Sequence, residues 1–200
     1  MKKPALLVID MLRDFLDAWD PAARRKLVDS INDLTTRARA QGLPVIWVRQ
    51  EFEADLRDAF REMKASGTRI TIKGTPGCEL VPELQVAPAD RVLIKKRYSA
   101  FFGTPLAHWL AELHVDGLIL AGINTHACIR TTAIDAYQRD WEIILAADCI
   151  GSYDREHHEV SLRYMRDKIA TVLTNVDIAA WLDAKKDDPT ATGSPGVRHP

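Results

Sequence analysis

The sequence contains few cysteines and carries almost no net charge, and each of these features argues against particular kinds of site or partner. Its three cysteines, Cys78, Cys128 and Cys149, are odd in number and have no CxxC spacing. A disulfide framework and a cysteine-ligated zinc site are therefore not expected. The formal net charge of −1 gives no reason to expect nucleic acid or a membrane surface as a partner.

Nucleotide-binding motifs and a long apolar run are also missing. No Gly-x-Gly-x-x-Gly or Walker sequence follows any apolar run, so a nucleotide cofactor is not supported. The apolar run near the N-terminus is broken by Asp10 after five residues, which is too short for the core of a signal peptide. We predict a cytoplasmic protein that has reduced thiols, no cofactor and a small molecule as its substrate.

Apolar runs of strand length alternate along the chain with segments of helical periodicity. This alternation predicts a three-layer α-β-α sandwich around a six-stranded, mainly parallel, Rossmann-like sheet. The predicted strands are 5–9, 43–48, 92–95, 117–121, 141–146 and 169–173. With 46% hydrophobic residues, we expect one domain over 1–184, and the polar, Pro/Gly-rich run 185–200 is predicted to be a disordered tail.

Three reactive side chains follow predicted strands. Asp10 and Lys95 stand at the ends of two apolar runs, and Cys128 lies in the turn that leads from a third run into a helix. Ligands of such sheets bind outside the carboxyl ends of the strands, where these three residues should meet. The first turn of a helix favours a thiolate, which suits a nucleophile, although a plain buried cysteine is equally compatible with the position.

Three motifs resemble the isochorismatase-like cysteine hydrolase superfamily, which includes nicotinamidases, N-carbamoylsarcosine amidase and ureidoacrylate amidase. They are LLVID ending at Asp10, KKRYSAFFGT starting at Lys95, and AGINTHACIRTTAIDA around Cys128. The resemblance implies Cys128 as nucleophile, Asp10 as general base and Lys95 as the stabilising cation. It also implies a cis peptide between Ile123 and Asn124, an oxyanion hole formed by the backbone N–H groups of Asn124 and Cys128, and a homodimer or homotetramer.

The neighbouring Lys96 competes with Lys95 for the site, because side chains on a strand alternate between its two faces. We favour Lys95, since the family lysine lies three residues before the Tyr-Ser pair, here Tyr98 and Ser99.

The predicted reaction is hydrolysis of a C–N bond in a small amide, carbamoyl or ureido compound, through a thioester and without a metal. Nicotinamidases carry an Asp-x-His-x-x-His metal cluster, whereas the matching segment 49–58, RQEFEADLRD, has no histidine. Isochorismatases proper hydrolyse a vinyl ether and lack the cysteine. Two alternatives stay open: ether hydrolysis of that type, and a non-enzymatic scaffold that senses redox state through Cys128. A base among His126, His157 and His158 ranks below Asp10.

The walls of the substrate pocket are less well determined by the sequence. An aromatic residue near Asp10 or Lys95 could line the pocket or fill the core. An arginine could bind a substrate carboxylate or form a surface salt bridge. The segment 74–78 could be a pocket rim, an oligomer contact or a connecting loop. The pocket candidates are Phe15, Tyr98, Phe101, Arg13 and Arg130.

Overall fold

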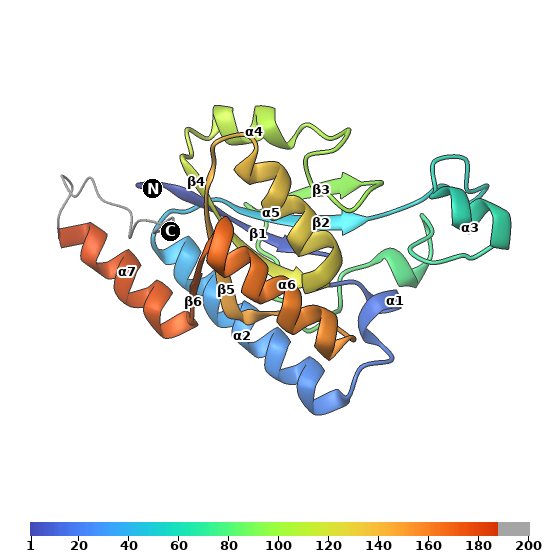
Figure 1. The fold of residues 1–200 in the computed structure, drawn as a ribbon, viewed down its shortest axis with the longest axis horizontal. Coiled ribbons are helices and arrows are strands. Elements are labelled where there is room, and N and C mark those ends of the chain that lie inside the picture. Colours follow the sequence, from blue (N-terminus) through green and yellow to red (C-terminus); the bar gives the residue numbers. More distant parts are fainter. Residues whose placement is uncertain (188–200) are drawn as a thin grey trace.

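The computed structural model describes residues 1–187, with side chains up to residue 184, and it contains a six-stranded sheet (Figure 1). The strand order is β3-β2-β1-β4-β5-β6, and every neighbouring pair of these strands is parallel. The strands are β1 Pro4–Ile9, β2 Val45–Gln50, β3 Arg91–Lys95, β4 Gly117–Ile123, β5 Glu142–Gly151 and β6 Thr171–Leu173. β1 and β4 are buried along their whole length, because helices cover both faces of the sheet.

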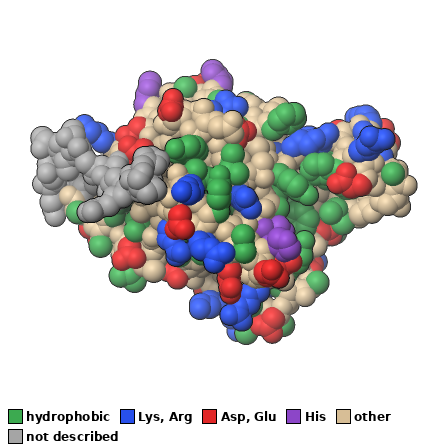
Figure 2. Space-filling model, in the orientation of Figure 1, with side chains coloured by type: hydrophobic (Ala, Val, Ile, Leu, Met, Phe, Trp, Pro, Cys, Tyr) green, Lys and Arg blue, Asp and Glu red, His purple; other side chains and the backbone are tan. Residues whose placement is uncertain are grey.

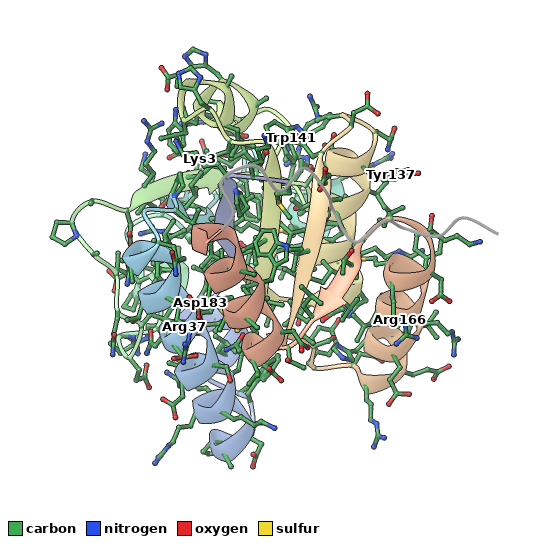
Figure 3. All side chains as sticks on the ribbon, turned by 90° about the vertical axis from the view of Figure 1, so that its left-hand side faces the viewer. Lys3, Arg37, Tyr137, Trp141, Arg166 and Asp183 are labelled. Atoms are coloured by element: carbon green, nitrogen blue, oxygen red, sulfur yellow. The ribbon has the colours of Figure 1, made fainter. Side chains whose placement is uncertain are left out.

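Helices form the two outer layers, and each layer has its own hydrophobic core against the sheet. Helices α2 and α7 pack on one face, with Gln41 Nε2 donating to Asp183 Oδ1 at 3.1 Å (Figure 3). Helices α4, α5 and α6 cover the other face, which confirms the predicted sandwich. The helices are α1 Arg13–Leu16, α2 Pro21–Ala40, α3 Arg61–Ser66, α4 Leu106–Glu112, α5 Arg130–Tyr137, α6 Arg155–Lys168 and α7 Asn175–Asp187, with a 3-10 turn at Pro76–Cys78 and a π-helical turn at Thr125–Ile129.

Helix α2 begins and ends where its sequence predicts. Asp20 is the N-cap, accepting a hydrogen bond from the Ala23 N–H at 2.9 Å, and Pro21 is the first helical residue. Its buried stripe packs on the sheet. No helix in residues 1–187 is both long and apolar enough to cross a membrane.

The bounds of every strand differ from the predicted ones by at least one residue, and three features differ more strongly from the prediction. Residues 13–16 form the short helix α1. Strand β5 runs on to Gly151 past an irregularity in its pairing with β4, so Asp148 and Cys149 lie inside it. Helix α7 continues to Asp187, because the alanine and lysine residues that follow Asp183 favour helix and suit the negative C-terminal end. Residues 185–187 are therefore helical rather than a tail, and the rest of the predicted tail lies outside the described residues.

Gly122 allows β4 to approach β1 closely near the carboxyl end of the sheet. Its φ is +109°, and a Cβ there would lie 2.0 Å from the carbonyl oxygen of Ile9. Gly122→Ala is therefore expected to lower the free energy of unfolding by at least about 3 kcal/mol, measured by urea denaturation. Gly74→Ala is the matched control: its φ is +78° but nothing lies within 4 Å of the added Cβ, so its expected cost is about 1 kcal/mol. Equal costs for the two variants would contradict the close-approach argument.

Candidate active site

Asp10, Lys95 and Cys128 meet at the carboxyl edge of the sheet. Lys95 Nζ lies 2.7 Å from Asp10 Oδ2 and donates to Cys128 Sγ at 3.4 Å. All three side chains are buried, and those of Asp10 and Lys95 are 1% and 0% exposed. An acid, a cation and a thiol thus share one enclosed corner, as the strand ends predict.

The backbone holds the acid and the cation in place. Asp10 has a φ of +55°, and its Oδ1 accepts a hydrogen bond from the Gln50 N–H at 2.9 Å. Lys95 Nζ also donates to the carbonyl oxygen of Arg97 at 3.1 Å. A buried ion pair needs such additional hydrogen bonds to offset the cost of removing both charges from water.

Cys128 lies in the π-helical turn between β4 and α5. Ile129 N donates to Asn124 O at 3.2 Å across this turn, and the Ile123–Asn124 peptide bond before it is cis. π-Helical turns are rare, and they occur frequently at functional sites. The turn places Cys128 beside Lys95.

Burial keeps the cysteine in its thiol form, contrary to the expectation from its place near a helix start. Burial raises the pKa of the Cys128 thiol strongly, the Asp10 carboxylate raises it further, and Lys95 opposes both. Burial also acts to lower the pKa of Lys95, but the charge of Asp10 and the hydrogen bonds to Asp10 and Cys128 outweigh it, so the pKa of Lys95 is raised. Formation of a thiolate at Cys128 therefore requires a base that accepts the thiol proton.

Lys96 faces away from this corner. Its Nζ donates to Glu51 O and pairs with Asp58 Oδ2 at 2.9 Å. The alternation of side chains along β3 thus directs Lys95 inward and Lys96 outward, as the motif spacing predicts.

Asp10 and Cys128 line a cavity of about 500 Å³, and Lys95 contacts both of them without lining it. Phe15 from α1 and Tyr98 after β3 line it, as predicted. Phe101 does not, because it is 5% exposed and packs in the core under α4.

Neither predicted arginine reaches the cavity. Arg13 pairs with Asp17 at 3.5 Å on the outer side of α1. Arg130 stacks over the ring of Tyr164 and donates to Ser161 Oγ at 3.4 Å. Neither side chain is among the residues that line the cavity, so this geometry does not support the prediction that one of them binds a substrate carboxylate.

Comparisons with known proteins agree with this geometry. The model of the isochorismatase domain matches residues 4–177. The chain belongs to the isochorismatase family. It is 31% identical over 180 residues to a probable isochorismatase of Pseudomonas chlororaphis, with 88% of this chain and 85% of the relative covered.

Solved structures of the isochorismatase family share the fold. An isochorismatase family protein from Desulfovibrio vulgaris is 31% identical, with a TM-score of 0.83 that covers 92% of this chain and 100% of that one. N-carbamoylsarcosine amidase from Thermoplasma acidophilum is also 31% identical, with a TM-score of 0.74 over 86% of this chain and 96% of that one. The chain is thus an isochorismatase-family hydrolase with both isochorismatase and amidase relatives.

Most of the cavity wall of this isochorismatase-family hydrolase was missed from the sequence. The additional residues come from segments far apart in the chain, and only their place just after strands β2, β4 and β5 or near α1 could have indicated some of them. They are Asp14, Ala18, Trp19, Gln50, Phe60, Glu62, Met63, Ile70, Ala127 and Tyr153, whereas Asn124 was predicted as an oxyanion-hole residue and His126 was considered only as a base.

The segment that holds the metal cluster of nicotinamidases is here occupied by ion pairs. Glu51 pairs with Arg49 at 2.9 Å, Glu53 with Lys73 at 3.2 Å, and Asp58 with Lys96. Across residues 1–187, no three His, Cys, Asp or Glu side chains gather in a way that could hold a metal ion. The donors of this segment therefore do not fit a transition-metal site, since their charges are already neutralised by lysine and arginine.

The segment 74–78 lies outside the cavity. Its 3-10 turn packs against α1, and Gly77 lies so close to Asp14 that an added Cβ would fall 2.2 Å from the carboxylate oxygens. Cys78 is buried and lies 3.9 Å from Glu51 Oε2. None of these residues lines the cavity.

Arg13→Ala and Arg130→Ala are expected to leave KM for any anionic substrate unchanged within about twofold, because neither guanidinium reaches the cavity. Steady-state kinetics of the two variants with the substrate of highest activity tests this. A tenfold rise in KM confined to anionic substrates would restore the earlier role of these arginines.

Proposed function

We propose that the protein hydrolyses a C–N bond in a small amide, carbamoyl or ureido compound through a thioester on Cys128. One observation carries this proposal: a buried cysteine lies 3.4 Å from a lysine that is itself paired with a buried aspartate at 2.7 Å. A thiol placed beside a cation and a carboxylate base has the parts of an activated nucleophile.

In the first half-reaction, Asp10 takes the proton from Cys128 Sγ and the thiolate attacks the carbonyl carbon. The backbone N–H groups of Asn124 and Cys128 donate to the resulting oxyanion, and each such donor is worth about 3 kcal/mol in other enzymes. The C–N bond then breaks, and Asp10 returns the proton to the leaving amine.

In the second half-reaction, Asp10 takes a proton from water, and the hydroxide attacks the thioester carbon. The C–S bond breaks and the proton returns to Cys128, which frees the acid product. Lys95 keeps its charge throughout and stabilises the carboxylate in one state and the thiolate in the other.

Two unsatisfied side-chain atoms support amide chemistry. Within the described chain, Gln50 Nε2 and Asn124 Oδ1 are buried and have no hydrogen-bond partner, and both residues line the cavity beside Cys128. A buried donor or acceptor without a partner costs about 1–3 kcal/mol, so a ligand that pairs with both gains from it. A carboxamide or ureido group offers a C=O and an N–H to this pair.

Ammonia release by the metal-stripped protein across a panel of small amides, carbamoyl compounds and ureides tests the proposal, with Cys128→Ala as the control. Release that depends on Cys128 and persists in chelator is the expected result. No release from any compound, together with hydrolysis of a vinyl ether that does not require Cys128, would overturn it.

A further inference from the structure

We propose that the cavity selects substrates whose non-reacting end is an ammonium cation and that it disfavours carboxylates. This inference rests on the proposed function for its chemistry, because it names the class of amide or ureide that reaches Cys128. It is argued from the walls of the cavity rather than from the reacting residues.

Aromatic rings form much of the wall. Phe15 and Trp19 come from α1 and the turn after it, Phe60 from the start of α3, Tyr98 from the loop after β3, and Tyr153 from the loop after β5. In Figure 2, hydrophobic side chains gather where the projecting part that carries α3 joins the body of the molecule. A cation within about 6 Å of such ring faces is attracted by their quadrupoles, and the attraction grows as water is excluded.

The ionised side chains on the wall, apart from the catalytic residues, are carboxylates. Asp14 is held in place by the Thr71 N–H, which donates to its Oδ2 at 2.6 Å. Glu62 is exposed, and no lysine, arginine or histidine of the described chain forms an ion pair with it. Both carboxylates therefore present negative charge to a ligand in the cavity.

Among the residues that the structure describes, no arginine or lysine side chain lines the cavity to balance these carboxylates. Lys95 lies beneath it and is neutralised by Asp10. Arg97 lies over the Phe60 ring, 5.0 Å from its centroid, but donates to backbone carbonyls rather than to a ligand position. Burial, and then the nearby His157, lower the pKa of His126, so this cavity residue carries little charge at neutral pH.

A second and independent feature fixes the orientation of the substrate. Gln50 is 3% exposed and lines the cavity together with Asp10 and Cys128, and its Nε2 is buried without a hydrogen-bond partner in the described chain. It donates to an oxygen at the reacting end of the substrate, which leaves the opposite end among the rings and the carboxylates. The cavity thus has a hydrogen-bonding end for an amide and an anionic, aromatic end for a cation.

Charge selectivity at Cys128 can be measured without any hydrolysis. We would compare the rates at which the cation trimethylammonioethyl methanethiosulfonate and the anion sulfonatoethyl methanethiosulfonate modify Cys128, followed by intact mass, with Cys128→Ala to identify the site. Each rate is divided by that of a free cysteine peptide. The normalised rate for the cationic reagent should exceed that for the anionic reagent by about tenfold or more. This ratio of the two rates should fall by about threefold in Glu62→Gln.

Glu112→Gln removes one carboxylate outside the cavity and is the matched control, for which the ratio should not change. Asp14→Asn gives a second variant, because the amide oxygen can still accept from Thr71. A ratio that favours the anion, or one unaffected by Glu62→Gln and Asp14→Asn alike, would overturn the inference.

A substrate series separates this inference from the proposed function. Butyramide, β-alaninamide and succinamate have similar length and carry no charge, a positive charge and a negative charge. The expected order of kcat/KM is β-alaninamide, then butyramide, then succinamate. If succinamate is hydrolysed best, the charge inference fails while the amidase proposal stands. If no amide is hydrolysed but Cys128 still prefers the cationic reagent, the amidase proposal fails and the charge selectivity of the cavity stands.

Discussion

Cys128→Ala is expected to lower kcat for the best amide substrate by about 10³-fold or more, because removal of a nucleophile leaves only binding and the oxyanion donors. Cys128→Ser should be nearly as inactive, since a hydroxyl is much harder to deprotonate than a thiol and lies beside the same weak carboxylate base. Ammonia release in single-turnover and steady-state experiments measures both.

Trapping of the acyl group on Cys128 tests the predicted role of this cysteine in a second way. When substrate and protein are mixed and quenched in acid, the wild-type protein should gain the mass of the acyl group on the peptide that contains Cys128. Cys149→Ala is the matched control: Cys149 is equally buried, but it donates to Asn175 Oδ1 at 3.1 Å, away from the cavity. A Cys128→Ala variant that kept a tenth of the wild-type rate would rule out the thioester route.

Because Cys128 rests as a thiol, the proposed reaction requires a base to remove its proton, and the sequence did not reveal this requirement. Position near a helix start predicted a stabilised thiolate, but burial and Asp10 raise the pKa of Cys128 beyond what Lys95 can offset. The degree of burial depends on the packing of β4, the π-helical turn and α6, which no local pattern records. The base is therefore needed at the moment of attack, and its partner lysine cannot replace it.

The fold and the proximity of Asp10, Lys95 and Cys128 could be predicted because their signals are local. Apolar runs of strand length end at Asp10 and Lys95, and a glycine turn precedes Cys128, so the parallel topology alone brings them to one edge of the sheet. Adjacent side chains at a strand end point in opposite directions, so only one of Lys95 and Lys96 could reach Asp10, and the spacing to Tyr98 and Ser99 indicated Lys95.

The residues that line the cavity could not be predicted, because their positions depend on the backbone conformation of short connecting segments. Residues 13–16 form a helical turn after β1, and this directs Arg13 outward while Asp14 and Phe15 face the cavity. Phe60 and Tyr153 come from segments about ninety residues apart and line the same cavity only in the folded chain. The proposed preference for a cationic substrate therefore differs from the carboxylate substrate expected with Arg13 or Arg130.

Lys95→Met is expected to lower the free energy of unfolding by about 3–5 kcal/mol, because it leaves the buried Asp10 carboxylate without its cation. Activity should fall with it, since the same ammonium contacts Cys128. Urea denaturation at pH 7 measures the stability. Lys96→Met is the matched control: its ion pair with Asp58 is partly exposed, so the expected cost is at most about 1 kcal/mol.

A second substitution separates the lost charge from the lost side-chain volume. Asp10→Asn combined with Lys95→Met removes both charges, while the amide oxygen can still accept from the Gln50 N–H, so the double variant should be more stable than Lys95→Met alone. A double variant no more stable than the single one would show that packing, not the unpaired carboxylate, accounts for the loss.

The pH dependence of the difference between wild type and Lys95→Met follows from the direction of the lysine shift. The pKa of Lys95 is raised in the folded protein, mainly by the charge of Asp10 acting against burial. Because this pKa is raised, the folded protein retains the Lys95 proton at a pH where the unfolded chain has lost it. The stabilisation of the folded state by Lys95 is therefore complete below the pKa of lysine in the unfolded chain, about 10.4. It is lost only as pH rises through the folded pKa, and the stability gap should therefore be constant between pH 7 and pH 9. A gap that shrank steadily across that range would mean that the lysine loses its proton near neutral pH, and its role as a permanent cation beside Cys128 would then fail.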